Sequence, residues 1–284
     1  MKKISLAILC ACALLFGNVF AQGDTTAPVY GWTHTLVSGL TLTQIAYTDW
    51  AQGGDNALAY AMGLEGKSVD DQANTNWTTS YKFAFGQARL GGKGLRKTED
   101  KIDLETILTY KLGTYINPYA AGTFKSQFTE GFKYDDTSRV RVSHFMDPAY
   151  MTQSIGVGYQ PVAEFKTRLG FALRETFADR YAAVYSDDPE TPEVEAMKIE
   201  GGLESVSELE SKFAEDMLLK AKLELFAPFK QLDVIVVRMD NTLTASVNEY
   251  INVNLNVQLI NERSITPRTQ IKETLALGFT YKLM

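Results

Sequence analysis

One stretch near the C-terminus, YINVNLNVQLINE at residues 250–262, alternates between apolar and polar side chains with almost no error. A period of two places successive side chains on opposite faces of a strand, whereas a helix would mix both sets on every face. The stretch therefore predicts a strand with one apolar and one hydrated face. Both a soluble β-sandwich and a membrane β-barrel contain such strands. The apolar set is Ile251, Val253, Leu255, Val257 and Leu259, and Asn252, Asn254, Asn256 and Gln258 form the polar set.

The same alternation recurs along most of the chain. The predicted strands cover about 35–47, 56–66, 77–88, 101–112, 114–125, 152–160, 163–175, 194–204, 214–227, 232–247, 249–261 and 269–283. Most are near ten residues or longer, which suffices to cross a bilayer when tilted, whereas sandwich strands usually have about five or six residues. We therefore expect an all-β, antiparallel transmembrane β-barrel of about 12 strands, within a range of roughly 10 to 14. An even strand number closes the sheet without a free edge.

The connections between the predicted strands differ in length. If the first strand starts on the periplasmic side, the two longest connections, 126–151 and 176–193, both lie outside the cell. Short turns are expected on the opposite side at Asn117–Pro118, after Pro161 and at Asn248–Glu249. This asymmetry is typical of outer-membrane barrels. The connection 66–76 is longer than expected for a periplasmic turn.

The N-terminus carries the features of a secretory signal peptide. Lys2 and Lys3 precede an apolar run, and Val19 and Ala21 form a small-residue cleavage pattern. We expect residues 1–21 to be the signal peptide, 22–34 an N-terminal segment and 35–284 the barrel, located in the cell outer membrane. A lipoprotein signal with Cys12 as the acylated residue is the alternative.

The composition of the chain limits the kinds of molecule that it is expected to bind. Cys10 and Cys12 are the two cysteines of the chain, so a chain cleaved after Ala21 has no thiol. The formal net charge is -6, and loss of two lysines with the signal peptide makes it -8. A mildly acidic chain has no electrostatic attraction to nucleic acid. The expected partners are outer-membrane lipid and the barrel assembly machinery, with an unknown solute.

Several segments in order resemble an uncharacterised outer-membrane β-barrel family of Bacteroidetes-type bacteria, a domain of unknown function. These segments are DWAQGGDNAL, GKGLRKTEDKIDLETILTYKLGTY, SQFTEGFKY, DPAYM, KLELF and QIKETLALGFTYKL, within residues 33–283. The most recognisable parts are the loop from Trp50 to Gly54, the stretch from Lys97 to Asp100 and the segment 127–132. The resemblance implies the fold and the location, and it supplies no substrate or catalytic residue. Glu130 replaces a usual proline, and the chain lacks a C-terminal aromatic residue.

Catalytic motifs are scarce. The only histidines are His34 and His144, and Ser143 beside His144 cannot by itself form a nucleophile–base pair, because neighbouring residues on a strand point apart. Zinc-ligand spacing, a phosphate loop and a dinucleotide fingerprint are absent from the sequence. The glycines of GGKGL at 91–95 indicate a turn. We expect no enzyme activity, no cofactor and no metal, with His144 a loop residue in contact with water.

Charged side chains occupy many positions on the polar faces of the predicted strands. They indicate a hydrated passage or a polar binding cavity, or else a mixed-sign network that fills a narrow barrel. A partly filled lumen is the interpretation we favour. The lumen-facing candidates are Lys82, Asp103, Glu105, Lys166, Arg168, Arg174, Lys220, Lys222, Glu224 and Arg238, together with Asp240, Lys272 and Lys282.

The two long connections carry two further patterns. The acidic tract 185–200 offers carboxylates for calcium but lacks the spacing of a calcium loop, so a solvated acidic loop is favoured. Aromatic residues in both connections form a ligand platform or, as we favour, loop packing. Two functions follow: passage or binding of a small polar or amphipathic solute, or a structural or interaction role of a filled barrel with functional external loops.

Overall fold

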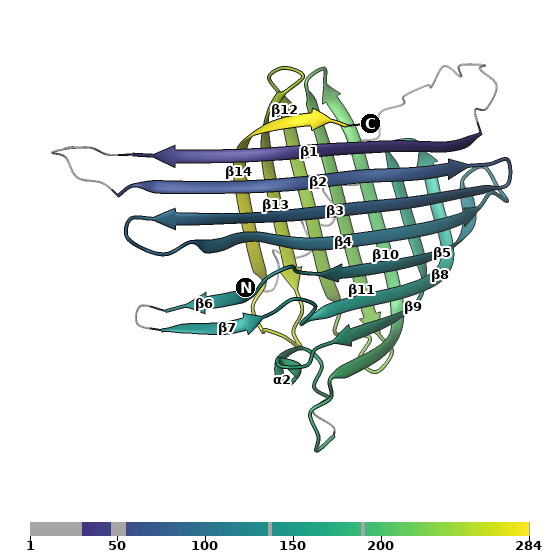
Figure 1. The fold of residues 1–284 in the computed structure, drawn as a ribbon. Helices are drawn as coiled ribbons and strands as arrows, with labels where there is room; N and C mark the ends of the chain where they lie inside the picture. Colours follow the sequence, from purple (N-terminus) through teal and green to yellow (C-terminus); the bar gives the residue numbers. More distant parts are fainter. Residues whose placement is uncertain (1–29, 47–54, 136–137, 189–190, 284) are drawn as a thin grey trace, which may run out of the picture.

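The computed structural model describes residues 30–46, 55–135, 138–188 and 191–283 (Figure 1). Its strands are β1 (Gly31–Ile45), β2 (Ala57–Asp71), β3 (Thr75–Leu90), β4 (Arg96–Tyr110), β5 (Ile116–Ser126), β6 (Gly131–Tyr134), β7 (Arg139–Ser143), β8 (Ala149–Val162), β9 (Phe165–Phe177), β10 (Met197–Ala214), β11 (Met217–Pro228), β12 (Val236–Ser246), β13 (Ile251–Asn261) and β14 (Gln270–Lys282). One short helix, α2 (Ala182–Tyr185), follows β9.

Within these described ranges, twelve strands form a closed antiparallel barrel. The order around the ring is β1-β14-β13-β12-β11-β10-β9-β8-β5-β4-β3-β2, so each barrel strand neighbours the next in sequence. The hairpin β6–β7 forms a separate small sheet between β5 and β8. The predicted all-β barrel of about twelve strands is confirmed, and each predicted segment overlaps one barrel strand.

The apolar faces of the strands point outward and are exposed. Leu275 on β14 is 75% exposed, and Phe171 on β9 and Ile155 on β8 are each 63% exposed. A soluble sandwich would bury these side chains in its core, whereas a transmembrane barrel presents them to lipid. The small buried apolar cluster, Ala172, Phe226 and Val236, includes the lumen-lining residues Phe226 and Val236. The fold is therefore that of a transmembrane β-barrel.

The two ends of the barrel have different connections. At one end, the turn end, the connections are short: 72–74, 111–115, 163–164, 215–216 and 247–250. At the other, the loop end, they include 127–148, which holds β6 and β7, and 178–196, which holds α2. The asymmetry expected from the sequence is thus present, with both long connections on the same side.

Several predicted strand bounds differ from the structure, and three of the differences change a turn or the length of a strand substantially. The long connection 66–76 is absent because β2 continues to Asp71, so the turn covers only 72–74. The turn expected at Asn117–Pro118 lies at 111–115, and both residues belong to β5. Pro118 pairs with Val157 of β8 but lies beyond the end of the β4 ladder, so its missing N–H breaks no bond there. The side-chain oxygen of Asn117 accepts hydrogen bonds from the backbone N–H groups of Leu112 (2.8 Å) and Gly113 (2.9 Å).

The third error concerns β10, which continues to Ala214 rather than ending near residue 204. Its outward positions include Ser205 and Ser207, whereas the inward Val206 is only 2% exposed. In this part of β10 the outward side chains are therefore not apolar, so the alternation that predicts a membrane strand is missing although the strand continues. Ser207 forms a hydrogen bond with Thr167 of β9 (2.9 Å) instead of packing as an apolar side chain.

Several expectations fall on residues that the structure does not describe: the signal peptide 1–21, most of the segment 22–34, Trp50 to Gly54 and the end of the chain. β1 begins at Gly31 rather than at residue 35. In the described part of the chain, no helix has the length and apolar character required to cross a membrane.

Candidate functional site in the barrel interior

The interior of the barrel is crossed by ion pairs between strands that are far apart in the ring. The ammonium nitrogen of Lys101 on β4 lies 3.0 Å from Oδ2 of Asp240 on β12. These two strands are opposite one another in the ring. Lys82 on β3 approaches the same oxygen to 3.9 Å, and Asp103 lies 3.5 Å from Lys101. Side chains from opposite walls can meet only inside the barrel, so this group spans its lumen.

A second group surrounds Glu105 on β4. Its Oε1 accepts a hydrogen bond from Nη2 of Arg168 on β9 (2.5 Å), and its Oε2 accepts one from Nζ of Lys222 on β11 (2.8 Å). Glu105 and Arg168 are 9% and 7% exposed. Both carboxylate oxygens therefore have a cationic partner, which a buried charge requires. Lys222 also lies 3.3 Å from Glu224, and Glu224 accepts a hydrogen bond from Lys125 on β5 (2.5 Å).

A third group lies at the loop end of the lumen. Glu262, the first residue after β13, forms ion pairs with Arg174 of β9 and with Arg238 of β12, the latter at 2.9 Å. The guanidinium of Arg238 lies 5.0 Å from the ring centre of Tyr150. Burial by itself raises the pKa of the Glu262 carboxyl, but the two guanidinium charges outweigh it and lower this pKa to about 2. Glu262 is therefore anionic at neutral pH.

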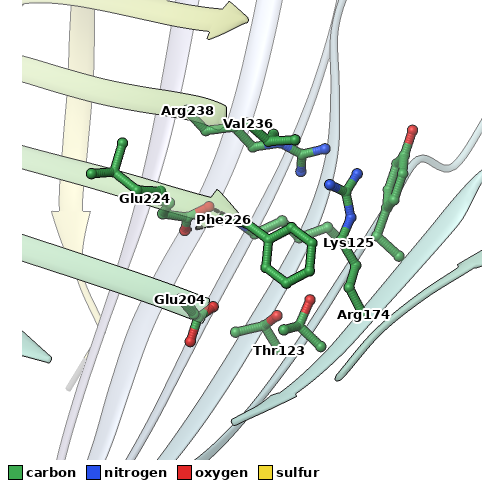
Figure 2. Close-up of a pocket in the computed structure, with 11 residues that line it drawn as sticks. Thr123, Lys125, Arg174, Glu204, Glu224, Phe226, Val236 and Arg238 are labelled. Carbon is green, nitrogen blue, oxygen red and sulfur yellow. Dashed lines mark hydrogen bonds and ion pairs between the residues drawn. The ribbon is translucent and has the colours of Figure 1, made fainter. Parts of the chain in front are cut away.

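A small cavity separates the second and third groups. Figure 2 shows it between Arg174, Arg238, Glu204 and Glu224, with Phe226 beside the two guanidinium groups. Its volume of about 40 Å³ accommodates roughly one water molecule. Among the described atoms, Nε of Arg238 and Oε2 of Glu204 lack a hydrogen-bond partner, although both residues line this cavity. A water molecule here would satisfy buried polar groups, whereas a sugar-sized solute does not fit.

The remaining lumen-facing candidates have other first partners, although Glu208, the partner of Lys166, also lies 3.9 Å from Lys222 of the second group. Lys166 pairs with Glu208 on the neighbouring β10 (2.8 Å), and Lys220 lies 3.6 Å from Glu210. Lys272 on β14 forms an ion pair with Glu99 on β4. Lys282 is exposed at the end of β14. The structure thus brings together three groups, namely Lys82, Asp103 and Asp240; Glu105, Arg168, Lys222 and Glu224; and Arg174 with Arg238.

Sequence reasoning missed several partners in these groups. Lys101 shares the parity of Asp103, so the alternation of that strand was a usable signal. Glu204 and Glu208 lie on β10. The serines on the outer face of this strand weaken the alternation of apolar and polar side chains, so the strand was not predicted to continue past residue 204. Lys125 lies at the strand end, and Glu262 follows its strand, where no period applies. The closure of the ring decides which charged side chains form pairs, and the sequence around each residue does not indicate its partner.

The external residues considered for chemistry have ordinary partners. The ring nitrogen Nδ1 of His144 lies 3.4 Å from the backbone oxygen of Phe145, and Nε2 lies 3.9 Å from Glu130. In the acidic tract, Oε2 of Glu195 accepts a hydrogen bond from the backbone N–H of Asp188 (3.0 Å). Across the described ranges, no three His, Cys, Asp or Glu side chains gather as metal ligands.

Comparison with known proteins gave one family and several solved structures. Residues 42–132 match a family described as a protein of unknown function (DUF3078). No curated protein matched the chain. The chain is similar to an outer-membrane channel from Pseudomonas putida F1, at 11% identity and a TM-score of 0.39, over 93% of this chain and 99% of that one.

Two further solved structures resemble the chain with similar sequence identities and TM-scores. The translocator domain of the autotransporter NalP from Neisseria meningitidis has 9% identity and a TM-score of 0.37, over 88% of both chains. The toluene transporter TodX from Pseudomonas putida has 9% identity and a TM-score of 0.31, over 90% of both chains. These are likenesses of architecture between chains that share few residues.

Proposed function

We propose that the protein is an outer-membrane barrel that admits small polar solutes into a lumen narrowed by ion pairs across the barrel. Residues 1–21 direct its export and are removed, outer-membrane lipid surrounds the exposed apolar belt, and the barrel assembly machinery inserts it. The belt of outward side chains, represented by Leu275 and Phe171, supports the membrane location. The observation that carries the narrowing is the 3.0 Å contact between Lys101 and Asp240.

The charges of the lumen define what it admits. Each cross-barrel pair offers a cation and an anion that are already satisfied by one another, so a solute that displaces one partner must replace its interaction. Small ions and zwitterionic or strongly polar solutes do this, because they bring charge or several hydrogen bonds. An apolar solute leaves both charges unpaired, which is costly in a confined lumen. The barrel therefore favours small polar solutes and opposes free diffusion.

The location is tested by cell fractionation of a producing strain. We expect the protein in the outer-membrane fraction, with a slower gel migration after boiling, because stable barrels resist detergent until heated. Mass spectrometry of the purified N-terminus should find a chain that starts after Ala21. Recovery in the soluble periplasm would refute the membrane location.

Passage is tested with proteoliposomes that contain the purified barrel. In isotonic glycine the liposomes should swell faster than protein-free liposomes, and in isotonic raffinose the two should not differ. Swelling equal to that of protein-free liposomes in glycine would refute passage.

A second candidate function, an interaction role of the external loops, is favoured by how these loops are joined. The buried carboxylate of Asp147 accepts hydrogen bonds from the backbone N–H groups of Asp179 (3.3 Å) and Arg180 (2.9 Å), and Tyr185 donates one to the backbone oxygen of Val142 (3.2 Å). A hollow of about 410 Å³ opens beside this junction. If glycine does not pass, Asp147→Ala in the producing strain should impair an envelope phenotype that deletion of the protein also causes.

A further inference from the structure

The weakest joint of the barrel is the seam between its first and last strands. β1 and β14 pair from Val37–Lys282 to Thr41–Gly278, which is five residue pairs, whereas the next shortest ladder, β4 with β5, has eight. The same register would pair Leu42 to Ile45 with Leu277 to Thr274, but within the described ranges these four pairs are not formed. Figure 1 shows β14 reaching β1 near the C-terminal end of β14. The seam is thus split toward the loop end.

The split leaves backbone groups directed at the gap. At the turn end, the N–H of Leu283 donates to the backbone oxygen of Leu36 (2.8 Å), which fixes the hydrogen-bonded positions of this ladder. Antiparallel pairing repeats such positions every second residue. The N–H and C=O groups of Gln44 and Leu275 therefore point into the part of the seam that lies beyond the last formed pair, Thr41–Gly278. In hydrocarbon, such groups need a polar partner.

The side chains beside the split are apolar on the outer face of the barrel and mostly small or polar on the inner face. On the outer face, Leu42, Leu275 and Leu277 are 57%, 75% and 58% exposed. On the inner face, Thr274 and Ala276 alternate with these leucines, on the side from which Lys272 reaches Glu99 across the lumen. The gap therefore joins an apolar outer surface to a polar interior and carries hydrogen-bonding backbone along its edges.

We propose that this split is a lateral opening through which the acyl chain of a membrane amphiphile enters the loop-end half of the lumen. The chain lies against the leucines, and its polar end satisfies the backbone groups of Gln44 and Leu275. The surrounding bilayer supplies this occupant, because the opening faces the same lipid as the outer belt. The inference rests on the proposed membrane location and is independent of the passage of polar solutes.

Quenching by lipid tests the opening. The mature chain is expected to lack cysteine, so single cysteines can be introduced at Thr274, Leu275 and Thr123 and labelled with bimane. Thr123 lines the lumen on β5, away from the seam. Each variant is placed in phosphatidylcholine vesicles with or without brominated acyl chains. Leu275→Cys should be strongly quenched, Thr123→Cys hardly at all and Thr274→Cys to an intermediate, clearly measurable extent.

The pattern of quenching separates the two proposals. If Leu275→Cys is not quenched, the membrane location itself is wrong. If Leu275→Cys is quenched but Thr274→Cys is no more quenched than Thr123→Cys, acyl chains do not enter and the lateral opening is refuted.

Disulfide formation gives a second measurement that does not depend on a label. The double variant Leu40→Cys/Phe279→Cys places cysteines at a formed pair of the seam, and Gln44→Cys/Leu275→Cys places them at a hydrogen-bonding position within the split. After oxidation in vesicles, the first should be cross-linked in most molecules and the second in several-fold fewer. Equal yields would mean that the seam is closed in the membrane and would overturn the proposal.

Discussion

Nζ of Lys101 and Oδ2 of Asp240 lie 3.0 Å apart although their strands, β4 and β12, occupy opposite positions in the ring. The contact requires both side chains to extend across the lumen. Lys82 and Asp103 join the same group, at 3.9 Å from Asp240 and 3.5 Å from Lys101. Charges held in contact are screened far less by salt than charges that face one another across water. The interior thus acts as a set of paired charges rather than as a wide aqueous pore.

The first prediction concerns the buried pair of Arg168 and Glu105. Arg168→Glu would place a new carboxylate beside Glu105 and within reach of Glu204, so we expect the free energy of unfolding to fall by about 3–5 kcal/mol. Lys166→Glu is the matched control, because it reverses the same charge on the same face of β9, where the side chain is 40% exposed. That variant should lose less than about 1 kcal/mol. Urea unfolding in detergent measures both, and equal losses would contradict a filled lumen at Arg168.

The second prediction concerns the orientation of β13. Leu255 faces outward and is 41% exposed, whereas Asn254 accepts a hydrogen bond from Thr244 (2.7 Å) and donates one to Asn252 (2.5 Å). Leu255→Arg should destabilise the barrel by roughly 2–4 kcal/mol in lipid, and Asn254→Arg should cost less because the interior hydrates the charge. Unfolding in vesicles compares the two. A larger loss for Asn254→Arg would mean that the inner and outer faces are reversed.

The third prediction concerns pH. In the folded protein the pKa of Glu262 is about 2, below its ordinary value of 4.5. A lowered pKa stabilises the fold fully above the ordinary value, and this stabilisation is lost as pH falls from about 4.5 toward 2. The difference in thermal midpoint between wild type and Glu262→Gln should therefore be constant from pH 7 to about 5 and shrink below it. A difference that persists unchanged at pH 2.5 would refute the two ion pairs of Glu262.

The sequence predicted the barrel well because lipid and lumen act on alternate residues of every strand. The row of asparagines in β13 illustrates this, since its amides bond within the interior while Leu255 stays exposed. The prediction failed where that contrast is weak. The serines on the outer face of β10 concealed half of a strand, and Asn117–Pro118 resembled a turn because the position of Pro118 beyond the β4 ladder is not visible locally.

The partners within the interior were less predictable. The basic residues Lys166, Arg168 and Arg174 on β9 can meet Asp103 and Glu105 of β4 only where closure of the ring brings the two strands together. Closure does so for Arg168 and Glu105, whereas Arg174 pairs with Glu262 and Asp103 lies beside Lys101. Strand tilt and register fix these choices over separations of up to 173 residues along the chain, as for Lys272 and Glu99.

Single-channel conductance in planar bilayers tests most directly the claim that ion pairs across the barrel narrow the lumen. The double variant Lys101→Gln/Asp240→Asn removes the pair that spans the lumen and keeps similar side-chain volumes. Lys220→Gln/Glu210→Gln removes an exposed pair between neighbouring strands and is the control. We predict a small conductance for wild type, the same value for the control and a several-fold larger one for Lys101→Gln/Asp240→Asn. Equal conductance in all three proteins would contradict the account.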